Sequence, residues 1–183
     1  MSKYGNKLAT PEQVASLVRD GMWVDYGTVQ APRAFDRALA QRVGEVKNVK
    51  IRALGHLTPL EVMEKDPEAK SFWIGNWHIL GWTRKYIAEN RGTHIPYNFG
   101  EAARYYRDGL DVDIAVQIVT PMDKHGYFNF GPLCNFKKAV FERAKIIVVE
   151  VVEDMPWCYG GYDECIHISE VDYVIENKTD KLI

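Results

Sequence analysis

The sequence predicts an α/β protein with a doubly wound, mostly parallel sheet and helices on both faces. Short apolar runs alternate along the chain with segments whose apolar residues recur at helical spacing, and glycine and proline separate them. Several of the runs are apolar at successive positions, which is typical of strands that are buried on both faces. The 183 residues are enough for one domain with a sizeable core.

The first helix illustrates how each element is predicted. Thr10 can cap this helix, Pro11 takes its first position, Gln13 completes a capping box, and Gly21 ends it. The apolar stripe between these signals consists of Val14, Leu17 and Val18. An amphipathic helix therefore leads into the first strand, which we expect at residues 22–26.

The same alternation continues to residue 152. Pro32 opens a second helix, in which Phe35, Leu39 and Val43 recur at near-helical spacing. Further helices are expected at residues 83–90, 101–107 and 135–143, and further strands at 49–54, 71–74, 113–119 and 146–152.

Composition and charge exclude several classes of protein. Hydrophobic residues make up 46% and charged residues 26%, which argues against disorder, a coiled coil and collagen. The net charge of -2 leaves no excess of positive charge for a phosphate backbone, so we expect no nucleic-acid partner. The longest apolar stretch, residues 146–149, is too short to cross a membrane, and residues 1–10 contain no apolar signal core. We therefore expect a cytoplasmic protein without a membrane partner.

The three cysteines, Cys134, Cys158 and Cys165, are expected to be free thiols, because their number is odd and their spacing irregular. Cys158, Cys165 and His167 are zinc-type ligands within ten residues. They lack paired C-x-x-C spacing, and Cys165 and His167 alternate with isoleucines as strand residues do. No metal site is predicted.

Small and polar residues follow the predicted strands, at the edge where doubly wound sheets bind ligands. The loops concerned are residues 27–30, 55–56, 75–78 and 120–126. The fingerprints of dinucleotide-binding, P-loop, zincin and serine-hydrolase proteins are absent. The residues alone therefore predict ligand loops without a complete catalytic set.

The loop at residues 120–126 has two interpretations. Asp123, Lys124 and His125 could supply a general acid or base, yet P-x-D-x-x-G is also good turn chemistry. In such a turn Asp123 binds its own backbone and Gly126 takes a positive φ. We favour the turn and assign Asp123 and Gly126 a structural role.

The histidines and tryptophans near the strand ends are also open to two interpretations. His56 and His78 follow different strands and could face one crevice, but each could equally be a hydrogen-bonded surface histidine. Trp77 belongs to an aromatic-rich stretch that could line a pocket, although core packing is the commoner place for such residues.

An ordered series of segments carries a family resemblance. The strongest are Val112-Asp113-Ile114-Ala115 and the run from Val119 to Gly126, which is similar to a V-S-P-x-D-x-x-G motif with Thr120 in place of serine. Weaker pieces are residues 20–21, 31–32, 47–49, 144–151, 155–160 and 167–172. In this order they resemble the N-terminal half of the acetyl-CoA hydrolase/transferase family, which includes 4-hydroxybutyrate, butyryl and acetate CoA-transferases. The resemblance covers about residues 4–176.

The chain also departs from that family. Members usually have asparagine between the glutamate and the Met-Pro pair, where this chain has Val151-Val152-Glu153-Asp154. Members are roughly twice as long, and their nucleophilic glutamate belongs to the second half. The resemblance therefore implies an N-terminal domain at residues 1–176, the start of a linker at 177–183, and no catalytic residue in this chain.

The activity that the resemblance implies is CoA transfer between a short-chain acyl-CoA and a carboxylic acid, through a glutamyl-CoA intermediate. Coenzyme A would be a substrate, with no permanently bound cofactor. The expected partners are these substrates, a C-terminal catalytic domain or subunit, and further copies in a homo-oligomer. The alternatives are a thioester hydrolase of the same family and a non-catalytic assembly domain.

The resemblance also implies a pocket wall in the loops that follow the second and third strands. We expect Gly55 and Gly75 to let the backbone approach a ligand. His56 and Asn76 are expected to hydrogen-bond a substrate carboxylate, and Trp77 to set the length of the pocket. Gln30 is expected beside them as a further wall residue.

Overall fold

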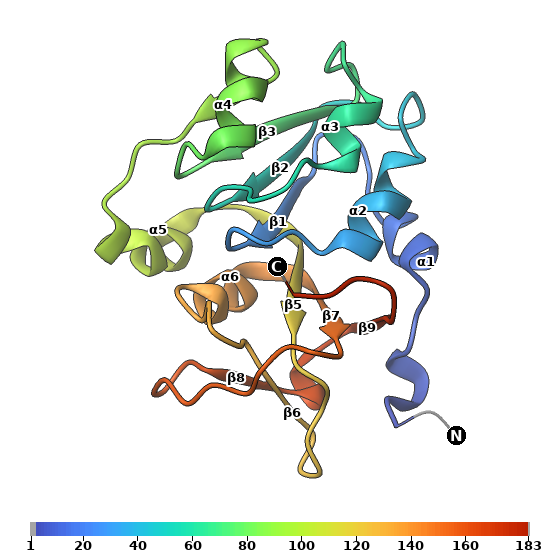
Figure 1. Ribbon diagram of the computed structural model, residues 1–183, viewed down its shortest axis with the longest axis vertical. Helices are drawn as coiled ribbons and strands as arrows, with labels where there is room; N and C mark the ends of the chain where they lie inside the picture. Colours follow the sequence, from blue (N-terminus) through green and yellow to red (C-terminus); the bar gives the residue numbers. More distant parts are fainter. Residues whose placement is uncertain (1–2, 183) are drawn as a thin grey trace.

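The computed structural model describes residues 3–182 and is built around a seven-stranded parallel sheet (Figure 1). The strand order is β4-β3-β2-β1-β5-β7-β9. The strands are β1 (Trp23–Gly27), β2 (Val49–Ala53), β3 (Phe72–Asn76), β4 (Gly92–His94), β5 (Val112–Val119), β7 (Ala144–Val152) and β9 (Tyr173–Asn177). Every pairing in this sheet is parallel, so the carboxyl ends of all seven strands lie along one edge.

The direction of winding reverses between β1 and β5, which are neighbours in the sheet. Strands β2 to β4 extend the sheet to one side of β1, and β5, β7 and β9 extend it to the other. A reversal of this kind opens a crevice beyond the strand ends. The predicted class, α/β with a doubly wound parallel sheet and helices on both faces, is confirmed.

One face of the sheet packs against four helices: α1 (Pro11–Ala15), α2 (Arg33–Ala40), α3 (Glu61–Lys65) and α4 (Gly81–Ala88). We call this the α2 face. Every second strand residue points to it, so Val24, Ile51 and Ile74 lie side by side in the ladder and are fully buried. The helices contribute Phe35, Leu39 and Tyr86 among other residues to the same core cluster.

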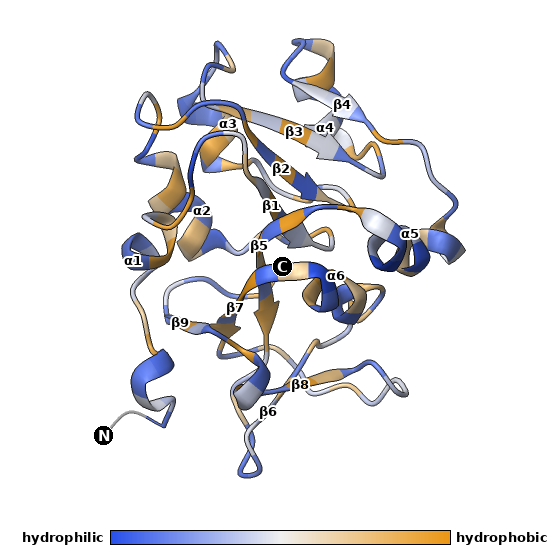
Figure 2. Ribbon diagram, turned by 180° about the vertical axis from the view of Figure 1, so that it is seen from behind, coloured by the Kyte–Doolittle hydropathy of each residue, from blue (hydrophilic) through white to orange (hydrophobic). Residues whose placement is uncertain are grey.

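The opposite face, which we call the α6 face, is covered by α5 (Ala102–Gly109), α6 (Lys137–Arg143) and a two-stranded antiparallel sheet of β6 (Tyr127–Asn129) and β8 (Cys165–His167). Figure 2 shows β5 largely in hydrophobic colours, whereas the turn leading to β6 is hydrophilic. Short 3-10 helices lie at Gly5–Lys7, Phe99–Glu101 and Ile168–Glu170. On this face an open apolar pocket of about 360 Å³ lies over β1 to β4, between Trp23 and Trp73.

Most predicted elements exist, with shifted ends. The capping box of Thr10 and Gln13 is confirmed, with both of its hydrogen bonds present, but α1 ends at Ala15 instead of reaching Gly21. Residues 16 and 17 form a turn, the Val18 carbonyl accepts hydrogen bonds from Arg19 and Arg42, and Val18 still packs in the core. Pro32 precedes α2 as its cap residue and does not lie within it. The elements that sequence patterns missed are α3, β4, β6 and β9, each of five residues or fewer.

Candidate functional site

Buried polar side chains gather at the carboxyl ends of four adjacent strands, β3, β2, β1 and β5. Asn76 ends β3, His56 follows β2, Thr28 follows β1 and Gln117 lies two residues before the end of β5. All four are at most 1% exposed. Each carries at least one buried nitrogen or oxygen without a hydrogen-bond partner among residues 3–182. Unpaired groups of this kind are costly, so their concentration at one edge marks a candidate ligand site.

His56 is the most unusual of these residues. Its side chain is buried, and neither Nδ1 nor Nε2 makes a hydrogen bond of good geometry within the described part of the chain, although the Asn76 side chain lies close enough for a weak one. Burial lowers the pKa of the imidazole to about 4, and the nearby Asn76 side chain opposes this in part. His56 is therefore neutral at physiological pH, with one N–H donor and one bare nitrogen. The alternative of a hydrogen-bonded surface histidine is wrong for His56, whereas His78 is exposed.

Asn76 lies beside His56 at the end of β3. Its Nδ2 donates to Thr83 Oγ1 of α4 at 2.9 Å, and its Oδ1 is unpaired. The expectation that Gly75 and Asn76 follow the strand needs correction, because both belong to β3 and pair with Arg52 and Ala53 of β2. Asn76 alternates with Gly75 and therefore points to the α2 face.

Gln117 was not predicted and lies on the other side of the sheet, whereas Thr28 belongs to the predicted ligand loop at residues 27–30. Gln117 Nε2 donates to the Lys137 carbonyl at 3.4 Å, on the α6 face. A Cβ atom on Gly27 would lie 2.7 Å from Gln117 Oε1, so the side chain fits beneath the end of β1 only because residue 27 is glycine. The structure thus brings His56 and Asn76 together, and places Gln117 under β1 on the opposite face.

The two glycines of the predicted wall are packed against protein. The space beside Gly55 is filled by Leu80, whose Cδ1 would lie 2.9 Å from an added Cβ, and the space beside Gly75 by Ile95 at the same distance. The missing side chains of these glycines therefore make room for Leu80 and Ile95 of this same chain. Their contribution to a pocket wall stays a prediction.

Gln30 and Trp77 are both 4% exposed, so neither lines an open cavity in this structure. Gln30 lies in the loop between β1 and α2. Trp77 packs on the α6 face between Tyr97 and Tyr106, with ring centroids 4.8 Å and 5.9 Å away. An influence of Trp77 on pocket length would act through the packing of this aromatic cluster.

Asp123 lies in the turn between β5 and β6. Its Oδ1 accepts hydrogen bonds from the backbone N–H groups of His125 and Tyr127 at 2.9 Å and 2.8 Å, which lower the pKa of the carboxyl. Gly126 has a φ of 89°, and an added Cβ would meet the His167 ring. This geometry supports a structural role for Asp123 and Gly126, although it tests no catalytic role.

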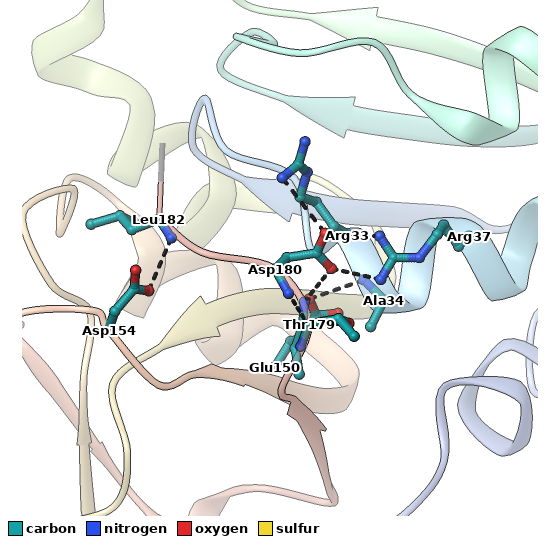
Figure 3. Close-up of polar contacts among 9 residues, drawn as sticks. Arg33, Ala34, Arg37, Glu150, Asp154, Thr179, Asp180 and Leu182 are labelled. Atoms are coloured by element: carbon teal, nitrogen blue, oxygen red, sulfur yellow. Dashed lines mark hydrogen bonds and ion pairs between the residues drawn. The ribbon is translucent and has the colours of Figure 1, made fainter.

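A buried carboxylate occupies the amino end of α2, close to the strand-end edge. Glu150 of β7 accepts a hydrogen bond from the N–H group of Ala34 at 3.1 Å (Figure 3). It also accepts from the N–H group of Phe35 at 2.9 Å and from Asn177 Nδ2 at 2.7 Å. Burial raises the pKa of this carboxyl. Because Glu150 takes the place of an external anion, the amino end of α2 is not free to bind a phosphate group.

The segment after β9 folds back over this network. Asp180 forms a two-pronged ion pair with Arg37, at 3.0 Å and 2.6 Å, and accepts a hydrogen bond from Asn177 Nδ2 (Figure 3). The Leu182 N–H donates to Asp154 Oδ1 at 3.0 Å. Residues 178–182 are thus tied to the strand-end edge. The division into a domain at 1–176 and a linker at 177–183 stays a prediction, and residues 1, 2 and 183 lie outside the described part.

Residues 3–182 contain neither a metal-binding cluster nor a membrane-spanning helix. No group of three or more His, Cys, Asp or Glu side chains in this part of the chain could hold a metal ion, and all three cysteines are free thiols. Within the same residues, no helix is long and apolar enough to cross a membrane.

Comparison with known proteins agrees with this architecture. The chain is 41% identical to the butyryl-CoA:acetate CoA-transferase of Anaerostipes caccae, over 96% of this chain and 40% of that protein. It is 42% identical to a probable butyrate:acetyl-CoA coenzyme A-transferase of Syntrophomonas wolfei, over the whole chain and 41% of that protein. The chain therefore spans about two fifths of the length of these relatives.

Solved structures give the same result. The crystal structure of RipA from Yersinia pestis matches with a TM-score of 0.84 and 27% identity, over 98% of this chain and 44% of that one. The model of the acetyl-CoA hydrolase/transferase N-terminal domain matches residues 1–182. On the strength of this match and of the two transferase relatives, the chain belongs to the acetyl-CoA hydrolase/transferase family and represents its N-terminal domain.

Proposed function

We propose that this chain is the N-terminal domain of a CoA-transferase, which moves CoA between a short-chain acyl-CoA and a carboxylic acid. The observation that carries the proposal is the pair of buried side chains of His56 and Asn76 at the ends of β2 and β3, in which the imidazole nitrogens and Asn76 Oδ1 have no hydrogen bond of good geometry within residues 3–182. The Anaerostipes relative is a butyryl-CoA:acetate CoA-transferase, and the Syntrophomonas relative is a probable butyrate:acetyl-CoA coenzyme A-transferase. Both names support short-chain acyl-CoA and carboxylates as the substrate class.

The N–H of a neutral His56 fits a carboxylate or thioester carbonyl, and the Asn76 amide could contribute only through the second hydrogen of Nδ2, because the first is given to Thr83 and Oδ1 is an acceptor. A neutral imidazole offers one N–H donor, and in a buried site such a donor stabilises an oxygen that carries negative charge more strongly than it would in water. Because the pKa of His56 is lowered to about 4, the imidazole adds no positive charge that would hold a carboxylate product too tightly. His56 and Asn76 would therefore orient the acyl or acceptor carboxylate without taking part in bond formation.

Bond formation would fall to a glutamate outside this chain. Its carboxylate attacks the thioester carbonyl and expels CoA thiolate, which leaves an acyl-glutamyl anhydride. The thiolate then attacks the glutamyl carbonyl, releases the acyl group as a carboxylate and forms a glutamyl thioester; an acceptor carboxylate reverses the sequence. This chain would supply one wall of the pocket, and a catalytic domain or subunit the other.

The proposal is tested by joining this chain to the remaining three fifths of the Syntrophomonas relative. We expect the pure 183-residue chain to exchange no CoA between butyryl-CoA and acetate, and the fusion protein to do so. Exchange by the chain alone would overturn the division of roles. A folded fusion protein that only hydrolyses butyryl-CoA would identify a hydrolase, and one with neither activity would favour an assembly domain.

His56 and Asn76 are tested by substitution in an active fusion protein. We expect His56→Ala or Asn76→Ala to lower kcat/KM for the acceptor carboxylate about 5- to 150-fold, which corresponds to about 1 to 3 kcal/mol for one buried polar contact. His78→Ala is the matched control, because this histidine follows β3, two residues after Asn76, but is exposed. Unchanged kinetics in both variants would remove the pair from the pocket.

A further inference from the structure

A chain of buried hydrogen bonds connects Trp77 to an ion pair inside the sheet. Trp77 Nε1 donates to Tyr106 Oη at 3.3 Å, and Tyr106 Oη donates to Asp25 Oδ1 at 2.7 Å. The other oxygen of Asp25 accepts hydrogen bonds from Arg52 Nε and Nη2 at 2.9 Å and 2.6 Å. The four side chains thus link β1, β2, α5 and the residue that follows β3.

These four side chains are at most 4% exposed and have little freedom to move. The Arg52 guanidinium lies between the rings of Trp23 and Tyr106, 4.7 Å and 5.0 Å from their centroids, and also donates to the Asp111 carbonyl at 2.7 Å. Asp25 and Arg52 are directly opposite each other on β1 and β2. The Asp25 carboxylate therefore accepts hydrogen bonds from Arg52 on one oxygen and from the Tyr106 hydroxyl on the other, which fixes its position.

The hydroxyl of Tyr106 is not needed for packing. The ring stacks on Phe136 at 5.6 Å and contacts Trp77 edge-on at 5.9 Å, and a phenylalanine ring would fill the same space. The hydroxyl instead joins the indole N–H to the carboxylate and so fixes the rotation of the Trp77 ring. Trp77 directly follows Asn76 in the chain. The backbone N–H of Trp77 donates to the Ala53 carbonyl at the end of β2.

We propose that Tyr106, oriented by Asp25 and Arg52, is a positioning residue that holds Trp77 and with it the end of β3 at the acyl pocket. The link to an acyl pocket rests on the proposed function, because that pocket is the one assigned to His56 and Asn76. Its physical content is narrower: the Tyr106 hydroxyl, and not the ring alone, determines how the Trp77 indole is held.

The test is Tyr106→Phe, with Tyr105→Phe as the matched control. Tyr105 is the next residue of α5, half-buried, with a hydroxyl 3.5 Å from Glu101 Oε2. The indole N–H signals of the five tryptophans are followed by NMR in the 183-residue chain, and Trp77→Phe assigns the Trp77 signal. We expect Tyr106→Phe to shift this signal and to speed its hydrogen exchange at least about fivefold, the effect of one lost hydrogen bond. Tyr105→Phe should leave it unchanged.

A second measurement uses the active fusion protein. We expect Tyr106→Phe to reduce the preference for butyryl-CoA over hexanoyl-CoA, as a ratio of kcat/KM values, at least about threefold, and Tyr105→Phe to keep the ratio. An unchanged Trp77 signal in folded Tyr106→Phe overturns the positioning role, whatever the activity. A changed signal with an unchanged ratio overturns the link to the pocket. If the unsubstituted fusion protein transfers no CoA, the proposed function fails while the NMR result still decides the role of Tyr106.

Discussion

The burial of the Asp36 carboxyl is expected to make this domain less stable as the pH rises. The carboxyl lies in α2, is 3% exposed, and accepts hydrogen bonds from Tyr26 Oη at 3.0 Å and from the Glu61 N–H at 2.7 Å. Burial raises its pKa from 3.8 to about 7, because the two hydrogen bonds do not replace the lost hydration. Asp36→Asn keeps an acceptor oxygen and the shape of the side chain but cannot ionise.

The sign of the effect follows from proton linkage. Between pH 4 and 7 the folded state keeps a proton on Asp36 that the unfolded state has lost, so the stability of the wild-type protein falls as the pH rises. From pH 5 to 7 the free energy of unfolding falls by about 2 kcal/mol relative to Asp36→Asn, because the slope of about 1.4 kcal/mol per pH unit decreases as the pH approaches the folded-state pKa of about 7. From about one pH unit above that pKa the difference becomes constant.

The pH profile of the wild-type protein alone would hide this effect. His56, whose pKa is lowered to about 4 in the folded state, contributes stability above pH 6.5 that is lost on acidification to pH 4, opposite in sign to Asp36. The assay is therefore urea unfolding of both proteins at pH 5, 6, 7 and 8, compared as a difference. The reasoning would be refuted if the difference in free energy of unfolding did not change with pH. It would also be refuted if Asp36→Asn became less stable relative to the wild-type protein as the pH rises.

Substitutions at three further residues test the structural contacts near the carboxyl ends of the strands. Asp123→Ala should lower the melting temperature while Asp123→Asn, which keeps an acceptor for the His125 and Tyr127 N–H groups, should not; normal melting with lost turnover in the fusion protein would instead make Asp123 catalytic. Gly27→Ala should cost about 1 to 3 kcal/mol by urea unfolding, because its φ is 73° and its Cβ would press on Gln117; a neutral result would mean that Gln117 is free to move. Glu150→Ala should cost about 2 to 4 kcal/mol, because two N–H groups of α2 and the Asn177 amide lose their acceptor, and a smaller loss would show that water replaces it.

The parts of the fold that could be predicted from sequence are those with local signals. The capping box at Thr10 and Gln13 is a spacing of three residues, and the apolar strands β5 and β7 stand out by composition. Strands β4, β6 and β9 carry no comparable signal, because they are short and their pairing partners are distant in sequence. The ends of β3 were misplaced for the same reason: Gly75 and Asn76 resemble a loop until β2 and β4 pair with them.

The candidate site was predictable only in part. The rule that ligands gather at strand ends led to His56 and Asn76, but not to the side of the sheet on which each residue lies, since a shift of one residue in a strand reverses its face. Gln117 was hidden inside an apolar strand, and Glu150 of β7 reaches α2 from 115 residues away. Contacts at such separations leave no periodic trace in a single sequence.

The placement of the unpaired groups is itself an argument for a functional edge. One buried polar group without a partner costs about 1 to 3 kcal/mol, and a domain of this size has only about 5 to 15 kcal/mol of stability to lose. Five such atoms belong to Thr28, His56, Asn76 and Gln117, at the ends of four neighbouring strands. Selection for stability alone would favour apolar residues at these positions, as it has at Ile51 and Ile74 deeper in the same strands. A substrate or a second domain that supplied the missing hydrogen bonds, as the proposed function requires, would account for both the cost and its location.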